Sequence, residues 1–106
     1  MPKYLFRASY TADGAKGLIS EGGSGRVEVA ARLAEGLGGK LESYYFAFGE
    51  DDVVGILDLP DNVSMAAVNL TISATGLVNT KTTVLLTPAE IDEAARQSVS
   101  YRGPGD

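Results

Sequence analysis

Residues 40–59, KLESYYFAFGEDDVVGILDL, decide the fold of this chain. The segment predicts two β-strands that meet at Gly49, Glu50 and Asp51, because these residues separate two runs rich in β-branched, aliphatic and aromatic side chains. Successive side chains of a strand point to opposite faces, and here both faces receive apolar residues. A sheet with one solvated face would alternate apolar with polar residues. We therefore expect both faces of this sheet to be covered.

The turn of this hairpin sets the register of its strands. A two-residue turn led by Gly49 and a three-residue loop through Asp51 both suit the sequence. The two turns differ in register, but either places Tyr44 or Tyr45 opposite Gly55. Because an aromatic ring over a strand glycine covers its bare backbone, we expect such a pair at Gly55.

The composition is that of an ordinary globular domain. The chain has 106 residues, 44% of them hydrophobic and 22% charged, which argues against general disorder. We expect a single domain over residues 1–96 and a flexible tail over residues 97–106. Fourteen acidic and nine basic side chains give a net charge of −5, which disfavours nucleic acid and anionic membranes as partners.

The residue types that are absent limit the chemistry. The chain contains neither cysteine nor histidine, so it lacks thiolates, the commonest general base and the commonest zinc ligand. We expect no cofactor and no metal site. The sequence shows no signal-peptide pattern and no apolar run of about 18 residues, which predicts a cytoplasmic protein.

Periodicity and helix-start signals predict the remaining elements. Before the hairpin we expect a strand at 3–10, a short helix capped by Thr11, a flexible glycine linker at 22–25 and a helix at 26–37. After the hairpin we expect a helix at 62–75, capped by Asp61 or Asn62, and a strand at 77–86. A last helix begins with a capping box at Thr87 and Glu90 and runs to about residue 97.

The helix at 62–75 is predicted to be amphipathic. One stripe of apolar residues predicts the buried face, and it consists of Val63, Ala66, Ala67, Leu70 and Ala74. Asn69 and Thr71 are interpreted as exposed polar residues.

The element order is β-α-β-β-α-β with a C-terminal helix, which predicts an α+β fold. Two split β-α-β units indicate a ferredoxin-like sandwich, with four antiparallel strands in the order 4-1-3-2 and helices on one face. The uncovered face would leave in water either the residues Tyr44, Phe46, Phe48, Val54 and Ile56 or those opposite to them. Since such patches are rare on soluble monomers, we expect a homodimer packed sheet on sheet.

Several short motifs resemble the GYD domain family, named for a Gly-Tyr-Asp signature. They are the runs 39–45 and 49–54, Tyr10-Thr11 followed by Gly17-Leu18, and Thr80-Lys81-Thr82, and the likeness spans roughly residues 3–95. At the signature, Gly49 and Asp52 match, whereas Asp51 stands in the place of the tyrosine, so this chain lacks that phenol.

The resemblance implies a ferredoxin-like protein that forms a dimeric α/β barrel. From the uncovered sheet face we expect the partner to be the chain itself, in a homodimer or a higher homo-oligomer. The resemblance implies no established reaction. Related dimeric α/β barrels include cofactor-free monooxygenases, small-molecule binding domains and proteins whose role is assembly.

Three groups of residues are candidates for chemistry. The first is the acidic run at the hairpin tip, Glu50, Asp51 and Asp52. Its carboxylates could hold a hard cation or share a proton, but no further cation ligands are apparent. A solvated turn whose charges protect the sheet edge is the favoured interpretation, and Asp51 and Asp52 are kept as ligand-binding candidates.

The second candidate is Arg26, which follows a glycine run and begins a helix. Free N–H groups at a helix start attract anions, so Arg26 is the candidate for anion binding. The spacing matches neither a phosphate-binding loop nor a dinucleotide fingerprint, and a flexible linker is the favoured interpretation.

The third group is a set of tyrosines, Tyr4, Tyr10, Tyr44 and Tyr45, which could line an apolar cavity between sheet and helices. Aromatic residues of the core and of an interface are the competing interpretation. Three functions remain open: a homodimeric module that binds or senses a small apolar or aromatic molecule, an assembly protein without a ligand, and a cofactor-free monooxygenase-like enzyme. We rank the binding module first.

Overall fold

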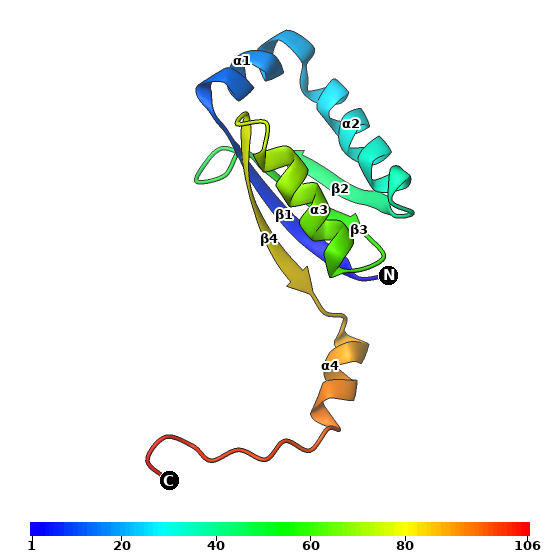
Figure 1. Cartoon of the computed structure of the whole chain (residues 1–106), viewed down its shortest axis with the longest axis vertical. Helices are drawn as coiled ribbons and strands as arrows, with labels where there is room; N and C mark the ends of the chain where they lie inside the picture. The colour runs from blue at the N-terminus through cyan, green and yellow to red at the C-terminus, as the bar shows by residue number, and fades with distance from the viewer.

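The computed structural model describes all residues from 1 to 106 and contains four strands and four helices (Figure 1). In chain order the elements are β1 (Lys3–Tyr10), α1 (Ala12–Glu21), α2 (Gly23–Gly36), β2 (Lys40–Phe46), β3 (Val53–Asp58), α3 (Asn62–Ser73), β4 (Val78–Leu85) and α4 (Pro88–Ala95).

The four strands form one antiparallel sheet in the order β2-β3-β1-β4. This is the predicted order 4-1-3-2 read from the other edge, and it confirms the α+β, ferredoxin-like arrangement. The sheet is open and does not close into a barrel within one chain. Helices α2 and α3 lie on the same face of the sheet, which we call the covered face (Figure 1). The opposite side is the open face.

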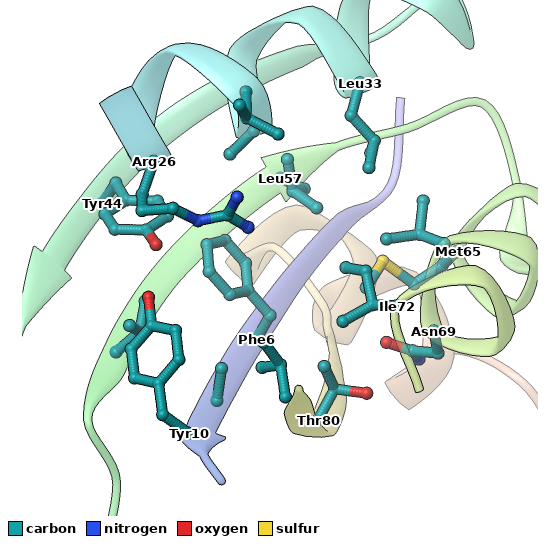
Figure 2. Close-up of a pocket in the computed structure, with 16 residues that line it drawn as sticks. Phe6, Tyr10, Arg26, Leu33, Tyr44, Leu57, Met65, Asn69, Ile72 and Thr80 are labelled. Carbon is teal, nitrogen blue, oxygen red and sulfur yellow. The ribbon is translucent and has the colours of Figure 1, made fainter. Parts of the chain in front are cut away.

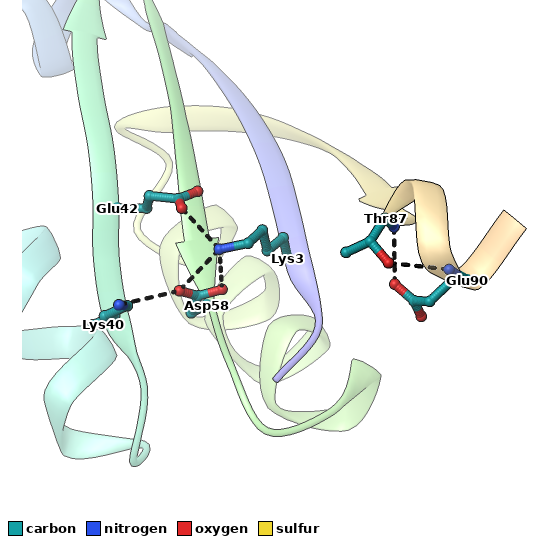
Figure 3. Close-up of polar contacts among 6 residues, drawn as sticks. All are labelled: Lys3, Lys40, Glu42, Asp58, Thr87 and Glu90. Carbon is teal, nitrogen blue, oxygen red and sulfur yellow. Dashed lines mark hydrogen bonds and ion pairs between the residues drawn. The ribbon is translucent and has the colours of Figure 1, made fainter. Parts of the chain in front are cut away.

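The predicted helix caps at Thr11, Asp61 and Thr87 are confirmed. The Thr11 side chain accepts a hydrogen bond from the Gly14 N–H, and the Asp61 side chain accepts one from the Ser64 N–H at 2.8 Å. At α4, the Glu90 N–H donates to the Thr87 hydroxyl at 3.1 Å and the Thr87 N–H donates to the Glu90 carboxylate at 2.9 Å (Figure 3). These contacts satisfy N–H groups that have no partner within the helix.

The predicted flexible linker at 22–25 was wrong. Residues Gly23 to Gly25 form the first turn of α2, and only Gly22 breaks the helical path between α1 and α2, with φ of 88°. A side chain is disfavoured there because that φ is left-handed. Gly23 is small for another reason: its Cα packs so closely on Phe46 that an added Cβ would come within 2.9 Å of the ring. Gly22 therefore allows a bend between two helices and Gly23 a close helix–ring contact, and the segment is not a flexible linker.

The hairpin keeps the predicted aromatic pair but not the predicted turn. Tyr44 lies opposite Gly55, as expected. The last paired residues are Phe46 and Val53, so the connection is longer than either turn considered. Asp52 explains the length, because its N–H donates to the Ala8 carbonyl at 2.9 Å and the second half of the loop is thereby held against β1.

A β-bulge at Glu42 also changes which side chains share a face. The register moves between Leu41 and Ser43, so Leu41 and Tyr44 both lie on the covered face. The grouping of Tyr44 and Phe46 with Val54 and Ile56 was wrong for a different reason: Tyr44 pairs with Gly55 and Phe46 with Val53, so both rings lie on the covered face.

The core lies between the covered face and helices α2 and α3. It is a cluster of six buried residues: Tyr4, Ala34, Leu57, Leu59, Met65 and Val68. The predicted buried stripe of α3 was wrong, since Val63 and Leu70 are 77% and 73% exposed. The helix is apolar on both sides, and the side that carries the larger Met65, Val68 and Ile72 turns inward.

The open face mixes apolar and charged side chains. Leu5, Ser43, Tyr45, Val54 and Ile56 lie on this face by register, and Tyr45 is 70% exposed.

Ion pairs lie at both ends of the open face. At one end, the Lys3 ammonium lies 2.8 Å from Glu42 and 3.0 Å from Asp58 (Figure 3). At the other end, Asp51 lies 3.8 Å from Arg7 and 3.7 Å from Lys81. The uncovered side is thus neither uniformly apolar, as the sequence indicated, nor uniformly polar.

The C-terminal segment extends away from the sheet (Figure 1). Helix α4 has no buried residue, and Leu86, Ile91, Val99 and Tyr101 are all exposed. None of the four helices has both the length and the apolar character needed to cross a membrane.

Candidate functional site

A cavity of about 120 Å³ lies between the covered face and helices α2 and α3 (Figure 2). All four strands and both helices contribute to its lining, and 13 of its 16 lining residues are hydrophobic. It exists because α2 packs over β2 while α3 packs over β4, so the strip of sheet between the helices is only partly filled. We call this space the central cavity.

Phe6 and Tyr44 line the sheet side of the central cavity, and Phe46 continues this row of aromatic rings outside it. The ring centroids of Phe6 and Tyr44 are 5.8 Å apart, and those of Tyr44 and Phe46 are 5.4 Å apart. These tilted and edge-to-face contacts hold the Tyr44 ring in place. Gly55 makes the row possible, because a Cβ at this position would collide with the Phe6 ring. The aromatic floor therefore depends on the strand glycine that the sequence singled out.

Arg26 reaches over this floor from the first turns of α2 (Figure 2). Its guanidinium pairs with Glu21 across the bend at Gly22, with an Nη1 to Oε2 distance of 3.7 Å. Its Nε is buried and has no hydrogen-bond partner. Because a buried donor without a partner carries a desolvation cost, this nitrogen is ready to donate to a guest molecule.

The hydroxyls of Tyr10 and Tyr44 point toward each other near Arg26 (Figure 2). Burial raises the pKa of the Tyr44 phenol above its usual range, and the neighbouring Tyr10 hydroxyl raises it further. The Arg26 guanidinium lowers the pKa of Tyr44 only in part. The Tyr44 phenol therefore stays protonated at neutral pH and can donate a hydrogen bond.

Asn69 supplies a polar group on the α3 side of the central cavity. Its Nδ2 donates to the Thr82 hydroxyl at 2.8 Å, while its Oδ1 is buried and has no partner. The central cavity thus contains an unpartnered donor near α2 and an unpartnered acceptor on α3, with apolar walls between them.

A second hollow of about 190 Å³ adjoins the central cavity under α1. The two spaces share Tyr10, Arg26, Ile72 and Val78. The side hollow is more polar, since it also includes Asp13 and Glu21. Arg26 and Tyr10 therefore stand at the boundary between an apolar space and a polar one.

The structure brings three of the predicted site residues together. Arg26 and Tyr44 both line the central cavity, together with Tyr10. Tyr4 does not line it; its side chain is 1% exposed in the core and its hydroxyl donates to Asn62 Oδ1 at 2.6 Å. Tyr45 lies on the open face.

The acidic residues of the hairpin tip also lie away from the central cavity. Glu50 and Asp51 both pair with Lys81, at 3.8 Å and 3.7 Å. The Asp52 carboxylate instead accepts a hydrogen bond from the Tyr10 N–H at 2.8 Å. Glu50 and Asp51 thus share Lys81, Asp52 has a different partner, and no cluster of three potential metal ligands is formed. Asp52 contributes to the site indirectly, by fixing the end of β1 that carries Tyr10.

Asn69 is the lining residue that the sequence interpretation missed. It is half-buried and faces the central cavity, whereas it was expected to be exposed. Its spacing held a usable signal: Met65, Val68, Asn69 and Ile72 follow the i, i+3, i+4, i+7 pattern of one helix face.

Comparison with protein families gives one match, the GYD domain, over residues 4–95. Comparison with curated proteins and with solved structures gives no match.

Proposed function

Since the chain belongs to the GYD domain family, we propose that it is a small-molecule binding module whose ligand occupies the central cavity. The observation that carries this proposal is an apolar cavity in which a buried donor, Arg26 Nε, and a buried acceptor, Asn69 Oδ1, both lack partners. A well-packed interior satisfies its polar groups, so such atoms beside an unfilled space favour a guest molecule.

The size of the central cavity sets the size of the ligand. A volume of about 120 Å³ compares with the engineered cavity of about 150 Å³ that accommodates benzene in another protein. A single aromatic ring or a compact aliphatic group fits this scale. The side hollow offers room for a polar substituent beyond Arg26.

Binding is better supported than acid–base catalysis. Tyr44 belongs to the aromatic floor, and the raised pKa of its phenol makes it a hydrogen-bond donor rather than a base at neutral pH. Asp51 and Asp52, the other candidates for proton transfer, lie outside the central cavity and have partners of their own.

Self-association through the open face is a second part of the proposal. Leu5, Val54, Ile56 and the exposed Tyr45 form the apolar part of that face, and a second copy would remove them from water. In such a homodimer each copy keeps its own central cavity, because the cavity lies on the covered face. Tyr45→Lys should shift the chain toward the monomer in light scattering at micromolar concentration. A wild-type chain that is already monomeric there would refute this part alone.

Filling the central cavity tests the binding proposal directly. Ala30 lines the cavity from α2, and Ala30→Leu would place a larger side chain in it. We expect this variant to fold with unchanged or higher thermal stability and to lose the increase in Tm that millimolar single-ring compounds give the wild type. Ala66→Leu, on the exposed side of α3, is the matched control and should keep the response. A response that survives in Ala30→Leu would place binding elsewhere.

A further inference from the structure

The polar groups of the central cavity differ in kind from one side to the other. Arg26 is the one charged residue among the 16 that line it, and no carboxylate lines the same space. Glu21 approaches the guanidinium through Nη1 and leaves the buried Nε free. The Arg26 side therefore presents positive charge and an unused N–H donor to an apolar interior.

Two phenols extend this donor set. The hydroxyls of Tyr10 and Tyr44 point toward each other beside the Arg26 side chain (Figure 2). A guanidinium joined by neutral hydroxyls is suited to an anion with two oxygens, because arginine donates parallel hydrogen bonds to a carboxylate. With a neutral ligand, the positive charge of Arg26 would be balanced only by Glu21, at 3.7 Å.

We infer that the ligand of the central cavity is a small organic acid, in which one carboxylate contacts Arg26, Tyr10 and Tyr44 and a compact apolar body lies over Phe6. This assignment rests on the proposed binding function and names the chemical class of its ligand. The aromatic floor and the aliphatic side chains of α2 and α3 contact the body, and the boundary with the side hollow admits the carboxylate.

Asn69 adds a second recognition element to the same ligand. Its Oδ1 can accept a hydrogen bond from a hydroxyl or amino group on the part of the body farthest from the carboxylate. An acid with such a substituent should therefore bind more tightly than the bare acid, by about 2- to 10-fold for one neutral hydrogen bond.

The test compares benzoate with its neutral analogue benzamide by calorimetry on the full chain. We expect the wild type to bind benzoate more tightly, and Arg26→Gln to weaken benzoate about 10-fold or more while benzamide changes little. Arg32→Gln is the matched control, because Arg32 lies on the exposed side of the same helix and pairs only with Glu28. Glu21→Gln removes the ion-pair partner of Arg26 and leaves the guanidinium charged. Because the competing carboxylate is gone, the affinity for benzoate should stay equal or rise.

Further comparisons separate the possible outcomes. In Asn69→Leu, 4-hydroxybenzoate should lose its advantage over benzoate. Equal binding of benzoate and benzamide, both abolished by Ala30→Leu, would overturn the organic acid while leaving the binding function intact. Equal losses of benzoate and benzamide in Arg26→Gln would show a structural role for Arg26 and would also overturn it. Binding of neither compound would overturn both proposals.

Discussion

The two faces of the sheet solve the problem of exposed side chains in different ways. The covered face is nearly all apolar, and two buried polar atoms beside its cavity, Arg26 Nε and Asn69 Oδ1, lack partners. The open face carries many charges, but they pair with one another around a strip of apolar residues. Unmet hydrogen bonds in a small cavity indicate a small ligand, whereas satisfied charges around an apolar strip are typical of a surface that meets a larger partner.

The largest expected effect comes from removing neighbouring side chains on opposite faces. Leu57→Ala, on the covered face, should lower the free energy of unfolding by about 2–5 kcal/mol, because Leu57 is 4% exposed and packs in the core. Ile56→Ala, on the open face, should cost clearly less in dilute solution. Urea denaturation measures both. Equal losses at low protein concentration would show that the open face is already as buried as the covered one.

A smaller effect distinguishes Tyr44 from Tyr45 at alkaline pH. Burial raises the pKa of Tyr44, so above a pH of about 10 the unfolded chain has lost this proton while the folded chain still holds it. The free energy of unfolding should therefore fall as pH rises above about 10, whereas below that pH the full stability is present and no such loss occurs.

Tyr44→Phe should make this alkaline loss shallower. Part of the loss should remain, because the pKa of Tyr4 is also raised. Burial is the main cause of that rise, and the negative charge of Asp61 adds to it. Tyr45→Phe, on the open face, is the control. Denaturant titrations at pH 8 and at a pH of about 11 provide the measurement, and an unchanged slope in Tyr44→Phe would contradict the burial of this phenol.

The smallest effect is expected for the ion pairs of the open face. Lys81→Ala removes the contacts to Glu50 and Asp51, at 3.8 Å and 3.7 Å. Exposed pairs contribute little, so the free energy of unfolding should change by less than about 1 kcal/mol, and less at high salt. A much larger loss would indicate that these charges are shielded from water by a second chain.

Much of the fold could be predicted because its signals are local. The capping box at Thr87 and Glu90 and the pairing of Tyr44 with Gly55 depend on residues close in sequence or on strand periodicity. The inward face of α3 could not be assigned in this way, because the helix is apolar on both sides and only packing against the sheet selects Met65 over Val63.

The candidate site was predicted only in part, for a related reason. Arg26 and Tyr44 were candidates, but they are 18 residues apart, one on a helix and the other on a strand. No pattern in the sequence indicates that they line the same cavity. The glycine run before Arg26 predicted a flexible linker, whereas position 23 requires a glycine because the Phe46 ring lies against it. Whether a buried atom has a partner depends on the whole fold and has no sequence signature.

The position of the C-terminal helix has a practical consequence. Every residue that lines either hollow precedes α4, and the chain end extends away from the sheet (Figure 1). A linker attached after Asp106 could therefore immobilise the protein on a sensor chip with its ligand-binding space unobstructed. The same geometry suits fragment screening, in which weak compounds must enter and leave freely.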